Sequence, residues 1–153
     1  HSDLAAMGHN TAASIHAIAE LDSILPETDL LVMALPSTAE TVGILSRERI
    51  ALLPDSALVV NVGRGTAIDQ EALCDALNAG QLAGAALDVV VPEPLPADHP
   101  LRRAKNLLLT PHVAGNMTLG YTCERNVQLF CENLENYAAG RPMHHLVDRR
   151  KGY

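Results

Sequence analysis

ALVVNVGRG (residues 57–65) joins an apolar run typical of a buried strand to an arginine between two glycines. An apolar run with a charged or titratable residue at its end or just after it occurs twice more, in ALDVVVPEP (residues 86–94) and in LLLTPHVAG (residues 107–115). The charged or titratable residues that follow these runs are Arg64, Asp88, Glu93 and His112. Because open α/β sheets bind ligands beyond the carboxyl ends of their strands, we expect these side chains to form one polar centre.

The apolar runs predict four strands, within DLLVMALP (29–36), ALVVN (57–61), LAGAALDVV (82–90) and NLLLT (106–110). Helical patterns lie between them: a short one over 46–53, and one that Asp69 caps and Gly80 ends. A longer helix is expected over 116–139, followed by an extended tail over 141–148. Alternating strands and helices with continuously apolar strands predict an α/β fold, a parallel sheet with helices on both faces.

The composition excludes several classes of protein. The chain has 153 residues, enough for one domain, and its net charge of −7 argues against a nucleic-acid partner. No apolar run reaches the length of a membrane span and no signal peptide is visible, so we expect a cytoplasmic protein. The three cysteines have no metal-ligand spacing and are expected to be reduced, structural thiols.

The titratable residues suit hydride-transfer chemistry on a small keto or hydroxy acid. Arg64 offers a planar fork that pairs with a carboxylate, although alone it would be an unremarkable loop residue. His112 can exchange a proton near neutral pH. Glu93 lies in an isolated Pro-Glu-Pro triplet, which by itself indicates a charged residue in a surface loop. The pair His144–His145 lacks accompanying ligands, so we expect no metal site.

At NVGRG, LDVVVPEP and TPHVAG the chain resembles the D-isomer-specific 2-hydroxyacid dehydrogenase family, which includes glyoxylate/hydroxypyruvate reductases. The likeness runs from about Leu21 to the end of the chain and includes LPSTAETVGIL, EPLPADHPL and LVDRRKGY. Several spaced motifs in the right order make the resemblance specific. It implies a Rossmann-like, doubly wound parallel sheet that binds a dinucleotide.

The chain departs from the family pattern near its beginning. The glycine-rich GxGxxG turn and the substrate-domain half that precede these motifs in the family are absent. We therefore expect an incomplete sheet, without its first βαβ portion. The resemblance assigns residues 1–122 to the C-terminal part of the dinucleotide-binding domain, and residues 123–153 to a helix and tail that return to a substrate domain.

The resemblance also implies roles for individual residues. Arg64, Glu93 and His112 would be catalytic: Arg64 would bind the substrate carboxylate, and His112 would be the general acid/base supported by Glu93. The residues expected at the cofactor are Leu35, Pro36, Thr41, Val62, Gly63, Arg64, Asp88, His112 and Gly115. Asp88 would lie beside the nicotinamide; the alternative is a strand-ending aspartate that caps the following loop.

The resulting hypothesis is an oxidoreductase that transfers a hydride between NAD(P) and a small D-2-hydroxy acid or 2-keto acid. NAD is slightly favoured over NADP because of Asp3, and the family suggests a homodimer. The alternative is a non-enzymatic protein of the same fold family that senses NAD(H) or dimerises. The glycine-rich turn normally anchors the pyrophosphate, so we expect these 153 residues alone to bind NADH weakly or not at all.

Overall fold

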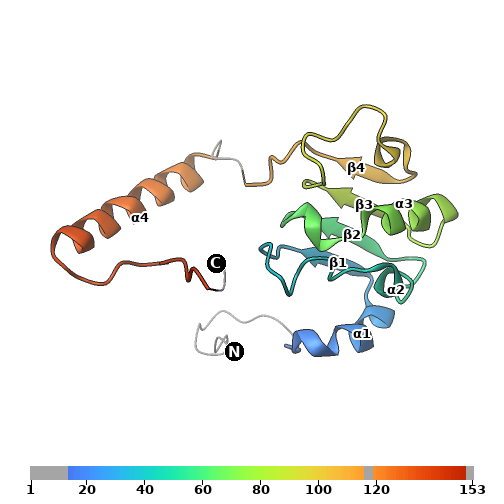
Figure 1. Cartoon of the computed structure of the whole chain (residues 1–153), viewed down its shortest axis with the longest axis horizontal. Helices are drawn as coiled ribbons and strands as arrows, with labels where there is room; N and C mark the ends of the chain where they lie inside the picture. The colour runs from blue at the N-terminus through green and yellow to red at the C-terminus, as the bar shows by residue number, and fades with distance from the viewer. Residues whose placement is uncertain (1–13, 116–118, 151–153) are drawn as a thin grey trace.

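The computed structural model describes residues 14–115 and 119–150 of the chain, and Figure 1 shows their arrangement. The expectation that rested on Asp3 lies outside the described residues. The strands are β1 (Leu30–Met33), β2 (Leu58–Asn61), β3 (Gly84–Leu87) and β4 (Leu107–Leu109). The helices are α1 (Leu21–Ile24), α2 (Arg47–Ile50), α3 (Gln70–Ala79) and α4 (Gly120–Ala138). Short 3₁₀ turns occupy Ile18–Glu20, Leu25–Glu27, Gly65–Ala67 and Pro100–Arg103.

The four strands form one parallel sheet in the order β1-β2-β3-β4, which confirms the predicted α/β class. Leu58 pairs with Leu30 on one side and with Gly84 on the other. This in-register pairing brings the carboxyl ends of the strands to one edge of the sheet. The loops that leave that edge carry the residues singled out in the sequence.

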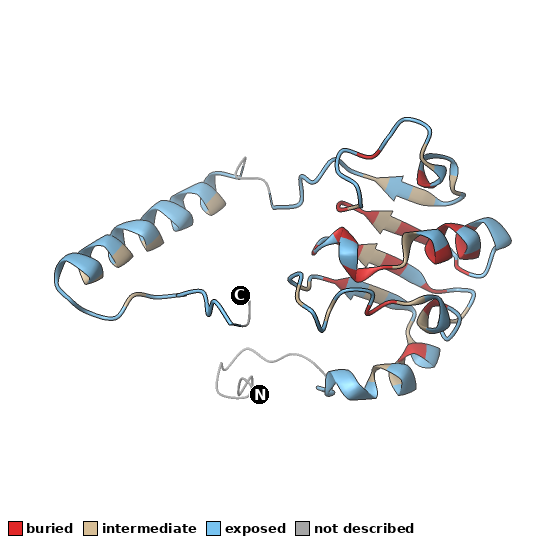
Figure 2. Ribbon diagram, viewed as in Figure 1, coloured by how far each residue is buried: buried red, intermediate tan, exposed pale blue. Residues whose placement is uncertain are grey.

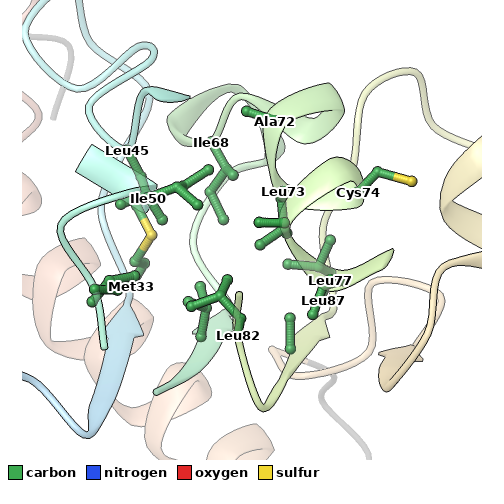
Figure 3. Close-up of a cluster of buried hydrophobic side chains, with 14 of the residues drawn as sticks. Met33, Leu45, Ile50, Ile68, Ala72, Leu73, Cys74, Leu77, Leu82 and Leu87 are labelled. Carbon is green, nitrogen blue, oxygen red and sulfur yellow. The ribbon is translucent and has the colours of Figure 1, made fainter. Parts of the chain in front are cut away.

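The predicted ends of α3 are confirmed. The Asp69 side chain accepts a hydrogen bond from the Ala72 N–H at 2.9 Å, and Gly80 ends the helix with a φ of 73°. Leu73 and Leu77 on the inner face of α3 are almost fully buried against the strand residues Val59 and Leu87. Figure 3 shows this core, in which α2 adds Ile50 beside Met33 of β1.

Helix coverage differs from the expectation of helices on both faces of the sheet. In the described part of the chain the core lies on one face, where α2 and α3 pack. The opposite face carries Leu30, Val32, Leu58 and Leu108, which are 46–62% exposed. Their apolar character predicted burial on both sides, but burial also needs a covering element, which a strand's own sequence does not provide. Figure 2 shows an exposed, pale-blue part of the ribbon within β4.

Helix α4 extends away from the sheet and contains no buried residue. The tail returns along it. The Asn133 side-chain amide accepts a hydrogen bond from the His144 N–H at 2.7 Å and donates one to the His144 carbonyl at 3.1 Å. Val127, Phe130 and Leu134 on this helix are exposed. Of the helices in the described residues, none has the length and apolar character that a bilayer span requires.

Candidate active site at the carboxyl edge of the sheet

The turn that carries Arg64 depends on its two glycines. A Cβ atom at Gly63 would lie 2.6 Å from the backbone nitrogen of Leu35, and one at Gly65 would lie 2.5 Å from the carbonyl carbon of Val90. Real Cβ contacts essentially never approach so closely. Glycine at both positions therefore lets the loops after β1, β2 and β3 meet around Arg64.

Asn61, the last residue of β2, holds the same turn through its side-chain amide. Its side chain is 1% exposed; it accepts a hydrogen bond from the Gly63 N–H at 3.0 Å and donates one to the Arg64 carbonyl at 2.9 Å. A buried amide with both ends bonded fixes the path of the backbone. The Arg64 guanidinium lies at the surface, where Nη1 donates to the Gly63 carbonyl at 2.7 Å.

His112 and Glu93 lie together, as predicted. His112 Nδ1 is 2.8 Å from Glu93 Oε2, and Glu93 Oε1 accepts from the Val90 N–H at 2.9 Å. The hydrogen bond with His112, then that with Val90, lowers the pKa of the Glu93 carboxyl from its usual 4.5, although desolvation opposes the shift; the Arg64 charge contributes further. An ionised carboxylate can only accept hydrogen bonds, so Nδ1 carries a proton and Nε2 remains for proton exchange.

The backbone of His112 adopts a conformation that is uncommon for a residue with a side chain, with a φ of 55°. Its N–H donates to the Asp88 carbonyl at 2.9 Å and to the Thr110 carbonyl at 3.1 Å. Backbone outliers of this kind persist only where the surrounding contacts hold them, and they concentrate at functional sites. The conformation is therefore consistent with a functional role for this histidine.

Asp88 supplies much of that support. Its carboxylate is buried and accepts hydrogen bonds from Thr110 Oγ1 at 2.5 Å, the Val113 N–H at 2.8 Å and the Ala114 N–H at 2.9 Å. Burial raises the pKa of Asp88, but these hydrogen bonds outweigh it and bring the pKa below its usual 3.8. Asp88 is thus an ionised cap for the loop that carries His112, and its place beside the nicotinamide stays a prediction.

Arg64, Glu93 and His112 line one small cleft of about 200 Å³ at the carboxyl edge of the sheet, together with Ser37, Val90 and Val91. A second hollow of about 500 Å³ shares Glu93 and His112 with this cleft and is also lined by Asp88, Leu95 and Arg102 among others. The cleft contains a cation for a carboxylate and a histidine for proton transfer, so it can hold a small carboxylic acid whose neighbouring carbon undergoes acid–base chemistry.

The residues predicted for cofactor binding lie on loops at the same edge. Leu35 and Pro36 follow β1, while Val62, which is 40% exposed, follows β2. Thr41 uses its hydroxyl within its own loop, donating to the Pro36 carbonyl at 2.6 Å and accepting from the Thr38 N–H at 2.8 Å. Gly115 is exposed, and a Cβ atom there would meet nothing within 4 Å.

Three polar residues that shape this site were not predicted from the sequence: Asn61, Thr110 and Gln70. The signal for Asn61 was present, since a polar residue that ends an apolar strand inside NVGRG needs buried partners. Thr110 bonds Asp88, 22 residues away in the sequence, and Gln70 bonds Val91, 21 residues away. Local sequence patterns do not indicate such long-range pairings. In residues 14–115 and 119–150 no group of three His, Cys, Asp or Glu side chains is placed to hold a metal ion.

Comparison with known proteins points to one family. Residues 4–114 match the family model for the NAD-binding domain of D-isomer-specific 2-hydroxyacid dehydrogenases. The chain is 40% identical over 135 residues to glyoxylate/hydroxypyruvate reductase A of Klebsiella pneumoniae, covering 88% of this chain and 42% of that protein. It is 38% identical over 124 residues to a hydroxypyruvate reductase of Blautia hydrogenotrophica, covering 81% of this chain and 38% of that protein.

Solved structures give the same result. A D-isomer-specific 2-hydroxyacid dehydrogenase from Xanthobacter autotrophicus, in complex with NADPH, superposes with a TM-score of 0.81 at 39% identity, covering 91% of this chain and 56% of that one. An NADPH-dependent glyoxylate/hydroxypyruvate reductase from Sinorhizobium meliloti, in complex with NADP and sulfate, gives 0.79 at 31% identity, covering 90% and 44%. The chain thus spans less than half the length of the curated relatives named here.

Proposed function

The chain belongs to the D-isomer-specific 2-hydroxyacid dehydrogenase family, and from this premise we propose that the protein interconverts a small 2-keto acid and its D-2-hydroxy acid, with NAD or NADP as redox cofactor. The substrate class we favour is that of glyoxylate and hydroxypyruvate, after the relatives' names. The observation that carries the proposal is the shared cleft of Arg64, Glu93 and His112, with the 2.8 Å contact between the last two.

In this mechanism Arg64 binds the substrate carboxylate through its guanidinium fork and places the adjacent carbonyl in the cleft. His112 donates a proton from Nε2 to the carbonyl oxygen during reduction and takes it back during oxidation. Glu93 holds the proton on Nδ1 and stabilises the imidazolium form that exists before reduction and after oxidation. Asp88 keeps the His112 loop in place through the amides of Val113 and Ala114.

The loops at this edge fit a dinucleotide cofactor. The close approach of Gly63 to the Leu35 backbone brings the loops after β1 and β2 together, and Pro36 and Val62 there expose apolar surface and backbone. Leu35, Pro36, Val62 and Gly63 would hold the cofactor, with Thr41 shaping their loop. When bound, the nicotinamide supplies or takes up the hydride.

Three further features belong to the same proposal. Residues 1–122 would form part of the dinucleotide-binding domain, and residues 123–153, which include most of α4, would pack on a substrate domain. The exposed residues of α4 support an additional packing partner, because large apolar side chains are rarely left in water. We also propose a cytoplasmic homodimer.

The proposal is tested by reduction of glyoxylate, hydroxypyruvate and pyruvate with NADH and with NADPH, measured in the complete protein. Arg64→Ala should lower kcat/KM by about 10²-fold, since it removes a charged, bidentate hydrogen-bond partner worth about 2–3 kcal/mol. Arg103→Ala is the matched control, because this exposed arginine lies outside the cleft. Clear NADH binding without turnover of any keto acid would favour the non-enzymatic alternative.

A further inference from the structure

The side-chain amide of Gln70 bonds both backbone groups of Val91. Its Nε2 donates to the Val91 carbonyl at 2.6 Å, and its Oε1 accepts from the Val91 N–H at 2.8 Å. Gln70 is the first residue of α3 and Val91 lies in the loop after β3, so this pairing joins two separate segments. The side chain pairs with the loop much as a neighbouring strand would.

The two joined segments form two walls of the cleft: Arg64, Gly65 and Thr66 line it from one segment, and Val90, Val91 and Glu93 line it from the other. On one side the chain runs from Arg64 through the 3₁₀ turn Gly65–Ala67 to Gln70, and Asp69 fixes its end by capping α3. On the other side Val91 lies between Val90, whose N–H binds Glu93 Oε1, and Glu93 itself. The bond from Gln70 therefore lies between the wall that carries Arg64 and the wall that carries Glu93.

We propose that Gln70 is a positioning residue that fixes the Arg64 turn and the Glu93–His112 pair at a set separation across the cleft. Gly65 and Val90 are in close contact at one point between the walls, where a Cβ on Gly65 would lie 2.5 Å from Val90. A single contact leaves the Val91–Glu93 segment free to pivot. The paired hydrogen bonds from Gln70 supply a second point of attachment, which removes that freedom.

The catalytic consequence rests on the proposed function. When Arg64 binds the substrate carboxylate, the adjacent carbonyl oxygen reaches His112 Nε2 only at one separation of the walls, and displacements of about 1 Å can cost about 10²-fold in rate. The structural consequence is independent of the reaction. Without Gln70, the hydrogen bond between Glu93 and His112 Nδ1 should break more often, and the Nδ1 proton should exchange faster with solvent.

The first experiment measures His112 itself in the 153-residue chain. Gln70→Met keeps the length of the side chain but removes both hydrogen bonds, and Gln81→Met is the control at an exposed glutamine just beyond the same helix. We expect the ¹⁵N NMR spectrum of wild type and control to show the Nδ1-protonated ring of His112, with slow exchange of that proton. In Gln70→Met the exchange of that proton should accelerate by about tenfold, because two hydrogen bonds of the anchoring loop are lost.

The second experiment measures kcat and KM in the complete protein. Gln70→Met should lower kcat by about tenfold while the control stays unchanged. An unchanged His112 signal in a folded variant overturns the proposal, whatever kcat does. If Gln70→Met does not fold, Gln70→Glu replaces it, because this isostere still accepts from the Val91 N–H but sets an oxygen that cannot donate against the Val91 carbonyl. If neither the wild type nor the control reduces any keto acid, the proposed function fails, and the His112 spectrum still decides the role of Gln70.

Discussion

Glu93→Gln tests the central pair of the site while keeping the size of the side chain. Only the amide oxygen can accept from the Val90 N–H, which the Glu93 carboxylate binds at 2.9 Å, so the NH₂ group must face His112. There it meets Nδ1 at the position that a carboxylate oxygen now occupies, 2.8 Å away. Nδ1 must then act as acceptor, and the proton of the neutral ring moves to Nε2.

Two losses set the size of the effect. The first is the attraction between carboxylate and imidazolium, which at about 4 Å is worth about 1 kcal/mol in water and about 4 kcal/mol near a protein surface. The side chains of His112 and Glu93 are 48% and 37% exposed, so a value of about 1–2 kcal/mol applies, or about five- to thirtyfold in rate. The second is the wrong tautomer, which removes general acid–base catalysis worth about 10²–10⁴-fold.

The predicted result is a fall in kcat of at least about 10²-fold, measured by NADPH or NADH oxidation with hydroxypyruvate in the complete protein. KM should change little, because Arg64 is untouched. The ¹⁵N spectrum of His112 should report Nε2 protonation in the neutral ring. Glu71→Gln on the exposed side of α3 is the control for loss of a carboxylate. A variant with near wild-type kcat, or with the proton still on Nδ1, would refute the role assigned to Glu93.

Two further predictions concern the support of the site. Asp88→Asn turns an NH₂ group toward the N–H of Ala114 and should destabilise the loop by about 1–3 kcal/mol in urea unfolding at neutral pH. The pKa of Asp88 in the folded protein lies below 3.8, so its contribution to the free energy of unfolding is present above that pH and is lost as the pH falls through the folded pKa. Asp88→Asn should lack this acid dependence of stability. An equal dependence in both proteins would contradict the assignment. Gly65→Ala should lower the free energy of unfolding several times more than Gly115→Ala does. A methyl group on Gly65 would overlap the Val90 backbone, whereas one on Gly115 meets open space. Equal urea midpoints for the two variants would disprove this prediction.

Much of the site was predictable because its main residues follow strands whose ends are marked locally. Arg64, Asp88 and His112 each follow an apolar run by a few residues, and a parallel sheet necessarily collects such positions at one edge. The pairing of Glu93 with His112 came from the family resemblance, because nothing in Pro-Glu-Pro indicates a partner 19 residues later. The hydrogen bonds of Asp88 to the next loop could be expected from a strand-ending aspartate, whereas its place beside the cofactor stays a prediction.

The sequence by itself determined the strands, the parallel α/β class, the limits of α3 and the set of charged groups at the strand ends, because those features follow from neighbours within a few positions. Only the tertiary structure decided how those groups are held. Asn61 hydrogen-bonds the Arg64 turn, Gln70 hydrogen-bonds Val91, and Asp88 hydrogen-bonds the His112 loop. It also decided that one face of the sheet stays open in the described residues. Each of these depends on a contact between separate segments or on a covering element, and neither is encoded in the periodicity of a single strand or helix.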